Sequence, residues 1–140
     1  MLKEAGSHNG PLRGLRVLVV EDDYFIALEL CHALRNAGAE VVGPARSVQS
    51  GLDAIRSEQL DCAVLDINLQ GQMGFQIAEE LRARDVPAIF ATGYDRGTIP
   101  DGLADLPRLE KPVDLSALCR AVESSVCDAR GRRTARPGSQ

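Results

Sequence analysis

The sequence predicts an α/β fold built on one five-stranded parallel sheet. Short apolar runs alternate along the chain with stretches whose apolar residues repeat at helical spacing, and this alternation indicates strands joined by helices. The run Cys62-Ala63-Val64-Leu65 is typical of a strand covered on both faces, and it leads directly into Asp66. Ligands of such sheets bind beyond the carboxyl ends of the strands, so we expect Asp66 at the functional edge.

Five apolar runs are expected to form the strands, at residues 15–20, 39–43, 62–66, 88–92 and 108–111. The first helix is expected from residue 24 to residue 37, because Gly38 is a good C-terminal stop. Ser47 suits the N-cap of the second helix, and Asp114 suits that of the last. A third helix is expected to follow Gly74, which closes a glycine-containing loop.

Proline and glycine predict two interruptions of this pattern. Pro44 is expected to end the second strand. Gly97, Pro100 and Gly102 argue against a long regular helix in residues 93–106. The fourth helix is therefore expected to be short or altered.

Length and charge indicate one domain with flexible ends. A chain of 140 residues with a hydrophobic fraction of 44% can form one domain with a real core. Residues 127–140 hold four arginines and one aspartate. We expect a flexible lead-in at residues 1–13, a folded domain at 14–126 and a disordered basic tail at 127–140. Because so short a segment is too small for a DNA-binding output domain, we expect none.

The same composition excludes several partners. Residues 1–126 hold 12 basic and 19 acidic side chains, a balance of −7, whereas a nucleic-acid binder needs a basic face. The four cysteines form no CxxC pair, and free thiols are typical of a reducing compartment. The N-terminus has no apolar signal segment, and no apolar run is long enough to span a bilayer. We therefore expect a cytoplasmic protein with neither nucleic acid nor membrane as a partner.

Polar groups at four strand ends predict one acidic pocket. Glu21 and Asp22 follow the first strand, Asp66 ends the third, Thr92 ends the fourth and Lys111 ends the fifth. The three carboxylates would repel one another, and Mg²⁺ resolves this because it takes carboxylates together with phosphate oxygens. A carboxylate can also attack a phosphoryl group, with lysine and threonine stabilising the transferred oxygens. Taken alone, Asp22 or Asp23 also suits an N-cap of the first helix.

At this point the sequence resembles the receiver domain of two-component response regulators. The resemblance extends over residues 16–126 and rests on Val-Leu-Val-Val-Glu-Asp at 17–22, Leu-Asp at 65–66, Ala-Thr-Gly at 91–93 and Lys-Pro at 111–112. It implies a flavodoxin-like, doubly wound (βα)5 fold. It also implies that Asp66 accepts a phosphoryl group from a histidine kinase or a histidine phosphotransfer protein.

The resemblance further implies a role for each pocket residue. Asp22 and Asp66 would bind Mg²⁺ directly, with Glu21 as the other acidic residue and the backbone carbonyl of Asn68 as a third protein ligand. Thr92 and Lys111 would contact the phosphoryl group, and the peptide bond before Pro112 is expected to be cis. Phosphorylation and dephosphorylation would be self-catalysed, so the protein is not expected to be an enzyme.

Residues 87–94, Pro-Ala-Ile-Phe-Ala-Thr-Gly-Tyr, are more narrowly similar to the FAT GUY group of single-domain regulators, known for an altered fourth helix. Two positions depart from common receivers. Arg108 stands where Tyr or Phe usually serves as a rotating switch, which argues against that switching mechanism. Gln70 stands where proline is frequent, and the sequence alone does not indicate a functional effect of this difference. We therefore expect a stand-alone regulator that acts through an unknown downstream protein or within a phosphorelay.

Three other functions fit the sequence less well. A phosphatase of the haloacid dehalogenase type needs a second aspartate two residues after the nucleophile, where this chain has Asn68. A flavodoxin-like FMN binder needs a phosphate loop after the first strand, where Glu21-Asp22-Asp23 would repel phosphate. A receiver-shaped scaffold that never switches is disfavoured by the full set of pocket residues, but the sequence leaves it open.

Overall fold

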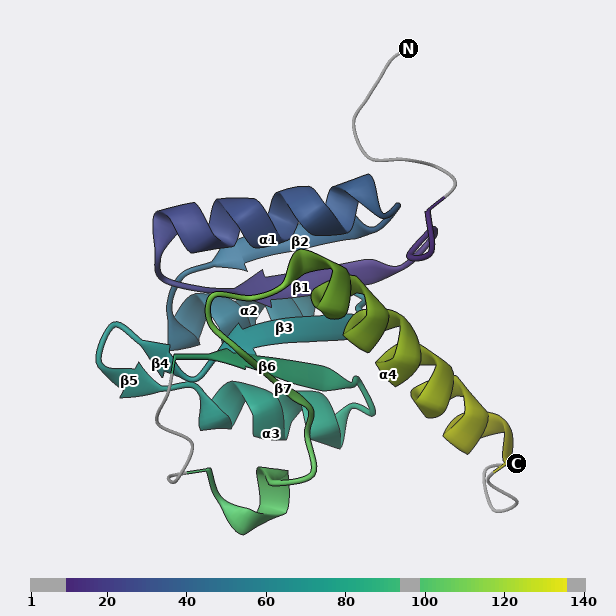
Figure 1. Cartoon of the computed structure of the whole chain (residues 1–140). Helices are drawn as coiled ribbons and strands as arrows, with labels where there is room; N and C mark the ends of the chain where they lie inside the picture. Colours follow the sequence, from purple (N-terminus) through teal and green to yellow (C-terminus); the bar gives the residue numbers. More distant parts are fainter. Residues whose placement is uncertain (1–9, 94–98, 136–140) are drawn as a thin grey trace.

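The computed structural model describes residues 10–93 and 99–135, and its centre is a parallel sheet with the strand order β2-β1-β3-β6-β7 (Figure 1). The strands are β1 (Arg16–Val20), β2 (Glu40–Ala45), β3 (Cys62–Asp66), β6 (Ala88–Thr92) and β7 (Arg108–Glu110). The helices are α1 (Tyr24–Asn36), α2 (Val48–Ser57), α3 (Phe75–Ala83) and α4 (Leu115–Ala135), with a 3₁₀ turn η1 (Asp101–Leu103). This is the flavodoxin-like α/β fold that the sequence predicts.

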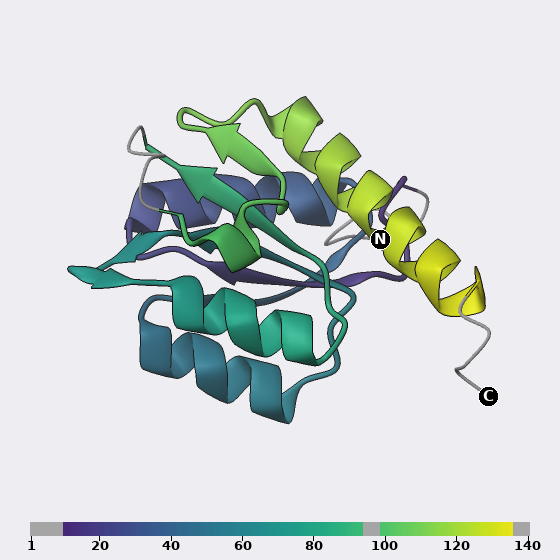
Figure 2. The same ribbon diagram turned by 90° about the horizontal axis from the view of Figure 1, so that it is seen from below.

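Helices cover both faces of the sheet. α1 and α4 lie on one face, and α2 and α3 lie on the other (Figure 2). Every residue of β3 and β6 is buried, as a strand between two helical layers requires. Each fully buried Leu, Ile or Phe contributes roughly 1.5–3 kcal/mol, so the two apolar clusters on either side of the sheet hold these strands in place.

The helices begin at side chains that cap them. Asp23 caps α1, because its Oδ1 accepts hydrogen bonds from the N–H groups of Phe25 and Ile26. Ser47 caps α2 in a reciprocal box with Ser50, as its sequence position predicts. The Asp114 carboxylate accepts hydrogen bonds from the second and third N–H groups after it, so it caps α4 as expected. Asp22 is thereby left available for another role.

The second strand extends further than expected. It continues through Pro44 to Ala45, although Pro44 was expected to end it. The Gly43–Pro44 peptide is cis, and the register with β1 shifts between Leu18 and Val20. β2 is an edge strand of the sheet, and a proline without an N–H group is tolerated there.

The N-terminal expectation is wrong for residues 10–13. Leu12 is fully buried, and its N–H group donates a 2.8 Å hydrogen bond to the carbonyl of Ala37. A single leucine among polar residues and glycines was too weak a signal to reveal this contact. Residues 1–9 lie outside the described residues.

The expected disordered tail is wrong for residues 127–135, because α4 continues without interruption to Ala135. Val122, Val126 and Ala129 keep the helical spacing and are buried, and Nη2 of Arg130 lies 3.6 Å from Oδ1 of Asp61. The arginine-rich composition masked the continuation of this stripe to Ala129 in the sequence. Residues 136–140 lie outside the described residues.

The described part of the connection between β6 and β7 contains no α-helix, as Pro100 and Gly102 predict. It holds the three-residue turn η1, in which Leu103 is buried against the α2–α3 side of the core. Tyr94 and Gly97, which figured in the sequence interpretation, lie outside the described residues. Arg108 lies exposed at the start of the edge strand β7. Within residues 10–93 and 99–135 no helix combines the length and apolarity that crossing a bilayer requires.

Candidate functional site

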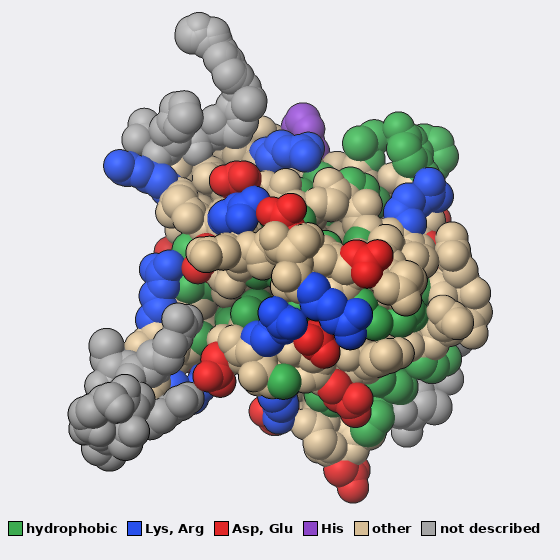
Figure 3. All heavy atoms as spheres, turned by 180° about the vertical axis from the view of Figure 1, so that it is seen from behind, with side chains coloured by type: hydrophobic (Ala, Val, Ile, Leu, Met, Phe, Trp, Pro, Cys, Tyr) green, Lys and Arg blue, Asp and Glu red, His purple; other side chains and the backbone are tan. Residues whose placement is uncertain are grey.

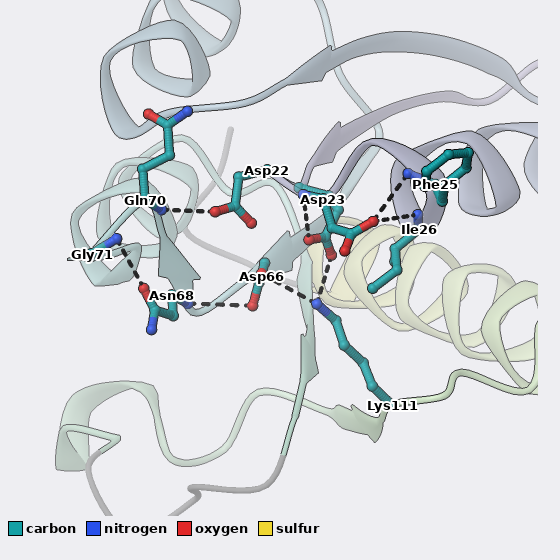
Figure 4. A network of polar contacts seen from close by, with 10 residues as sticks. Asp22, Asp23, Phe25, Ile26, Asp66, Asn68, Gln70, Gly71 and Lys111 are labelled. Atoms are coloured by element: carbon teal, nitrogen blue, oxygen red, sulfur yellow. Dashed lines mark hydrogen bonds and ion pairs between the residues drawn. The ribbon is translucent and has the colours of Figure 1, made fainter.

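The polar residues singled out in the sequence come together at the carboxyl edge of the sheet. Parallel pairing aligns Val20 of β1 with Leu65 of β3, and Asp66 with Ala91 of β6, so the ends of the three central strands coincide. Glu21 and Asp22 follow β1, and Lys111 follows β7. Figure 4 shows Asp22, Asp66 and Lys111 converging on the space beyond these strand ends.

Three carboxylates form the centre of the site. One oxygen from each of Glu21, Asp22 and Asp66 lies within 4.8 Å of the others. Glu21 is 1% exposed and Asp66 is 8% exposed, so water screens their charges poorly. Such a group of oxygens is unfavourable unless cations neutralise it.

Lys111 supplies part of that neutralisation. Its Nζ lies 2.8 Å from Oε1 of Glu21 and donates a 3.2 Å hydrogen bond to Oδ2 of Asp66. The backbone N–H of Lys111 donates to the carbonyl of Thr92, which fixes the lysine at the end of β7. The Lys111–Pro112 peptide is cis, as the resemblance implies.

Both members of the tighter ion pair have shifted pKa values. Burial raises the pKa of Glu21 to about 7, and the charge of Asp66 adds to this, although Lys111 and the N–H of Asp23 act in the opposite direction. Burial alone would lower the pKa of Lys111. The hydrogen bond to Glu21 and the charge of Asp66 outweigh that effect, so the pKa of Lys111 is above its usual value.

This donor set fits a hard divalent cation. One ammonium group faces three carboxylates, so positive charge is still needed, and oxygen ligands are those that Mg²⁺ prefers.

The two remaining predicted residues border the carboxylates. Asn68 begins the short strand β4 (Asn68–Leu69), and its N–H group donates a 3.3 Å hydrogen bond to Oδ1 of Asp66. Its side-chain oxygen accepts from the N–H group of Gly71. Thr92 is 4% exposed at the end of β6, directly after the residue that pairs with Asp66. The roles of the Asn68 carbonyl and the Thr92 hydroxyl stay predictions.

Sequence reasoning missed one group at the site, the N–H of Gln70, which donates a 2.9 Å hydrogen bond to Oδ2 of Asp22. β4 pairs antiparallel with β5 (Gln72–Met73), and Gln70 lies in the turn between them. The Gln70-Gly71 pair suggests a turn. Its contact with a carboxylate 48 residues away leaves no local signal in the sequence.

Comparison with known proteins agrees with this geometry. Residues 17–123 match the model of the response regulator receiver domain, so the chain belongs to that family. It is therefore a receiver domain of a two-component response regulator, a class of domain that histidine kinases phosphorylate. This membership agrees with the resemblance found in the sequence.

Two curated relatives are full-length regulators. The chain is 34% identical to the sensory transduction protein LytT of Bacillus subtilis over 104 residues, which are 71% of this chain and 43% of LytT. It is 27% identical to the transcriptional regulatory protein PdtaR of Mycobacterium tuberculosis over 115 residues, 79% of this chain and 56% of PdtaR. The chain thus spans about half the length of these relatives.

Two solved structures share the fold. The response regulator PhyR from Brucella abortus superposes with a TM-score of 0.77 at 23% identity, covering 93% of this chain and 56% of PhyR. The signal receiver domain of a modulated diguanylate cyclase from Desulfovibrio desulfuricans G20 also gives 0.77, at 26% identity, covering 84% of this chain and 98% of that domain.

Proposed function

We propose that Asp66 accepts a phosphoryl group from a histidine kinase or a histidine phosphotransfer protein in the presence of Mg²⁺. The observation that supports this most strongly is the position of Asp66. It ends a fully buried strand, and its two oxygens accept hydrogen bonds from Lys111 Nζ and the Asn68 N–H group. A carboxylate held in this way is oriented before the donor arrives, which is what phosphoryl transfer requires of the protein.

In the proposed step, an oxygen of Asp66 attacks the phosphorus atom while the bond from phosphorus to the donor's imidazole nitrogen breaks. The electron pair stays on that nitrogen, so the donor leaves as a neutral imidazole with its proton on the other ring nitrogen. The product is an acyl phosphate on Asp66. Lys111 is close enough to Asp66 to pair with the transferred oxygens, and Thr92 would donate a hydrogen bond to one of them.

The cation site belongs to the same proposal. Glu21, Asp22 and Asp66, with the carbonyl of Asn68, would hold Mg²⁺. When bound, the ion would supply positive charge beside the transferred oxygens. The ion pair between Lys111 and buried Glu21 keeps the ammonium group at the site.

A protein donor is favoured by an apolar surface beside the pocket. The first turns of α1 directly follow the acidic residues, and they carry Tyr24, Phe25 and Leu28 with 57%, 75% and 52% of their surface exposed. Figure 3 shows hydrophobic side chains protruding at its upper right, where α1 begins. Exposed aromatic residues beside a reactive group are typical of a docking surface.

The proposal extends to how the protein acts. As a stand-alone cytoplasmic receiver it would signal by altered binding of a protein partner or within a phosphorelay. Its own residues would catalyse phosphorylation and dephosphorylation, without turnover of an external substrate. On the side shown in Figure 3, basic and acidic side chains are interspersed, which does not favour nucleic acid as the partner.

Incubation with a small acyl phosphate donor and Mg²⁺, followed by intact-mass spectrometry, tests the acceptor. The wild-type chain should gain one phosphoryl group, and Asp66→Asn should gain none. Asp23→Asn is the matched control, because asparagine is as good an N-cap as aspartate and the site keeps its three carboxylates. Undiminished phosphorylation of Asp66→Asn would refute the assignment.

A further inference from the structure

The loop after Asp66 is a tight hairpin that contacts the acidic cluster. Strands β4 and β5 pair Asn68 with Met73 and Leu69 with Gln72, and Gln70 and Gly71 form the two-residue turn. Both turn residues are left-handed, with φ angles of 52° and 84°. Such a turn matches the twist of a hairpin, but it is unfavourable for a residue with a side chain such as Gln70.

Two hydrogen bonds offset this cost. The Gln70 N–H group donates to Oδ2 of Asp22 at 2.9 Å, and the Gly71 N–H group donates to the side-chain oxygen of Asn68 at 3.2 Å. The first bond has a carboxylate as its acceptor, and such charge-assisted bonds are the stronger kind. The hairpin is therefore held onto Asp22 by its own backbone.

This bond also orients Asp22. Figure 4 shows one Asp22 oxygen bound to the Gln70 nitrogen while the carboxylate lies above Asp66. A carboxylate oxygen has two lone pairs, and the second oxygen accepts no hydrogen bond from Gln70, so the bond leaves capacity for a cation. In metal sites, the groups that hydrogen-bond to a ligand fix its orientation and raise the affinity for the metal.

We propose that the backbone N–H of Gln70 is a positioning group for Asp22, so that closure of the β4–β5 hairpin and Mg²⁺ binding strengthen each other. This inference rests on the proposed cation site. Linkage is reciprocal: if the closed hairpin raises the affinity for Mg²⁺ by some factor, saturating Mg²⁺ favours the closed hairpin by the same factor. Binding of Mg²⁺ inside the pocket would thus change the conformation of the hairpin at the molecular surface, where Met73 is 49% exposed.

A matched pair of glycine variants tests the linkage. Gly71 and Gly14 have φ angles of 84° and 81°, and an added Cβ meets no atom within 4 Å at either position. Alanine therefore introduces the same backbone strain at both. Gly71 lies in the hairpin, whereas Gly14 lies before β1 at the opposite end of the sheet.

Calorimetric titration should show that Gly71→Ala raises the dissociation constant for Mg²⁺ about tenfold. This is the lower end of the loss in affinity expected when a metal ligand loses its hydrogen-bond partner. Gly14→Ala should bind as the wild type does. An α-hydroxy acid at position 70 replaces the backbone amide between Leu69 and Gln70 by an ester, which removes the N–H donor and keeps the side chain. This change should weaken Mg²⁺ binding at least as much. In the wild type, Mg²⁺ should slow exchange of the Gln70 amide hydrogen by a similar factor.

The outcomes separate this inference from the proposed function. If the wild type binds Mg²⁺ and Asp66→Asn does not, but the ester and Gly71→Ala bind it normally, the positioning role is refuted and the cation site stands. Equal weakening in Gly71→Ala and Gly14→Ala refutes it as well, because general strain then explains the loss. Failure of the wild type to bind Mg²⁺ overturns both.

Discussion

The two halves of the sheet contribute differently to the site. β1 and β3 lead to the three carboxylates, and regular helices connect these strands to the rest of the sheet. β6 and β7 lead to Thr92 and Lys111, and the described part of their connection holds only the three-residue turn η1. The groups proposed to hold the cation thus lie on the more regularly built half. The groups proposed to meet the phosphoryl oxygens lie on the half whose described connection has no α-helix, and we expect local rearrangement to cost less there.

The largest expected effect tests this difference in packing. Leu34 on α1 is fully buried and Leu103 in η1 is 2% exposed, so both lose a buried side chain on change to alanine. Leu34→Ala should cost about 4 kcal/mol of unfolding free energy and Leu103→Ala about 2 kcal/mol, because the irregular segment can collapse around the space. Urea unfolding measures both. Equal costs would show that the two halves are equally rigid.

A pH series tests the electrostatics of the acidic half. Burial raises the pKa of Glu21 from 4.5 to about 7, so between these values the folded protein holds a proton that the unfolded chain has lost. Metal-free wild type should therefore lose about 3 kcal/mol of stability from this group as the pH rises from about 4.5 to about 7. Glu21→Gln should lack this loss. Parallel pH profiles of the two proteins in a chelating buffer would contradict the burial argument.

A smaller effect is expected at the docking surface. Phe25→Ala removes an exposed ring without disturbing the carboxylates, and it should slow phosphotransfer from a histidine phosphotransfer protein by about tenfold, or 1.4 kcal/mol. Phosphorylation by a small acyl phosphate serves as the control and should be unchanged. Equal slowing with both donors would show that Phe25 affects the phosphoryl-transfer step itself. No slowing with either donor would show that Phe25 on α1 does not contribute to donor recognition.

The sequence predicted the site better than its surroundings. Glu21, Asp22, Asp66 and Lys111 could be predicted to meet because each follows a strand of one parallel sheet, and the ends of such strands share an edge. The helix caps Ser47 and Asp114 could also be predicted from the sequence, because a cap side chain bonds to backbone N–H groups within the next four residues.

The structural features that the sequence did not predict depend on contacts between distant segments. The bond from Gln70 to Asp22 and the backbone bond from buried Leu12 to Ala37 leave no local pattern. The continuation of α4 to Ala135 was hidden by arginines around one small buried residue, Ala129. The extension of β2 through Pro44 is tolerated because that strand lies at the sheet's edge and its register with β1 shifts there.

Chemical trapping tests the central claim most directly. Borohydride reduces an acyl phosphate to an alcohol, so a phosphorylated aspartate becomes homoserine at its own position. After incubation with a small acyl phosphate and Mg²⁺, then reduction and proteolysis, peptide mass spectrometry should find homoserine at position 66, next to Leu65 and Ile67. Homoserine at position 22 or 23 with Asp66 intact would contradict the assignment of Asp66 as the phosphoryl acceptor.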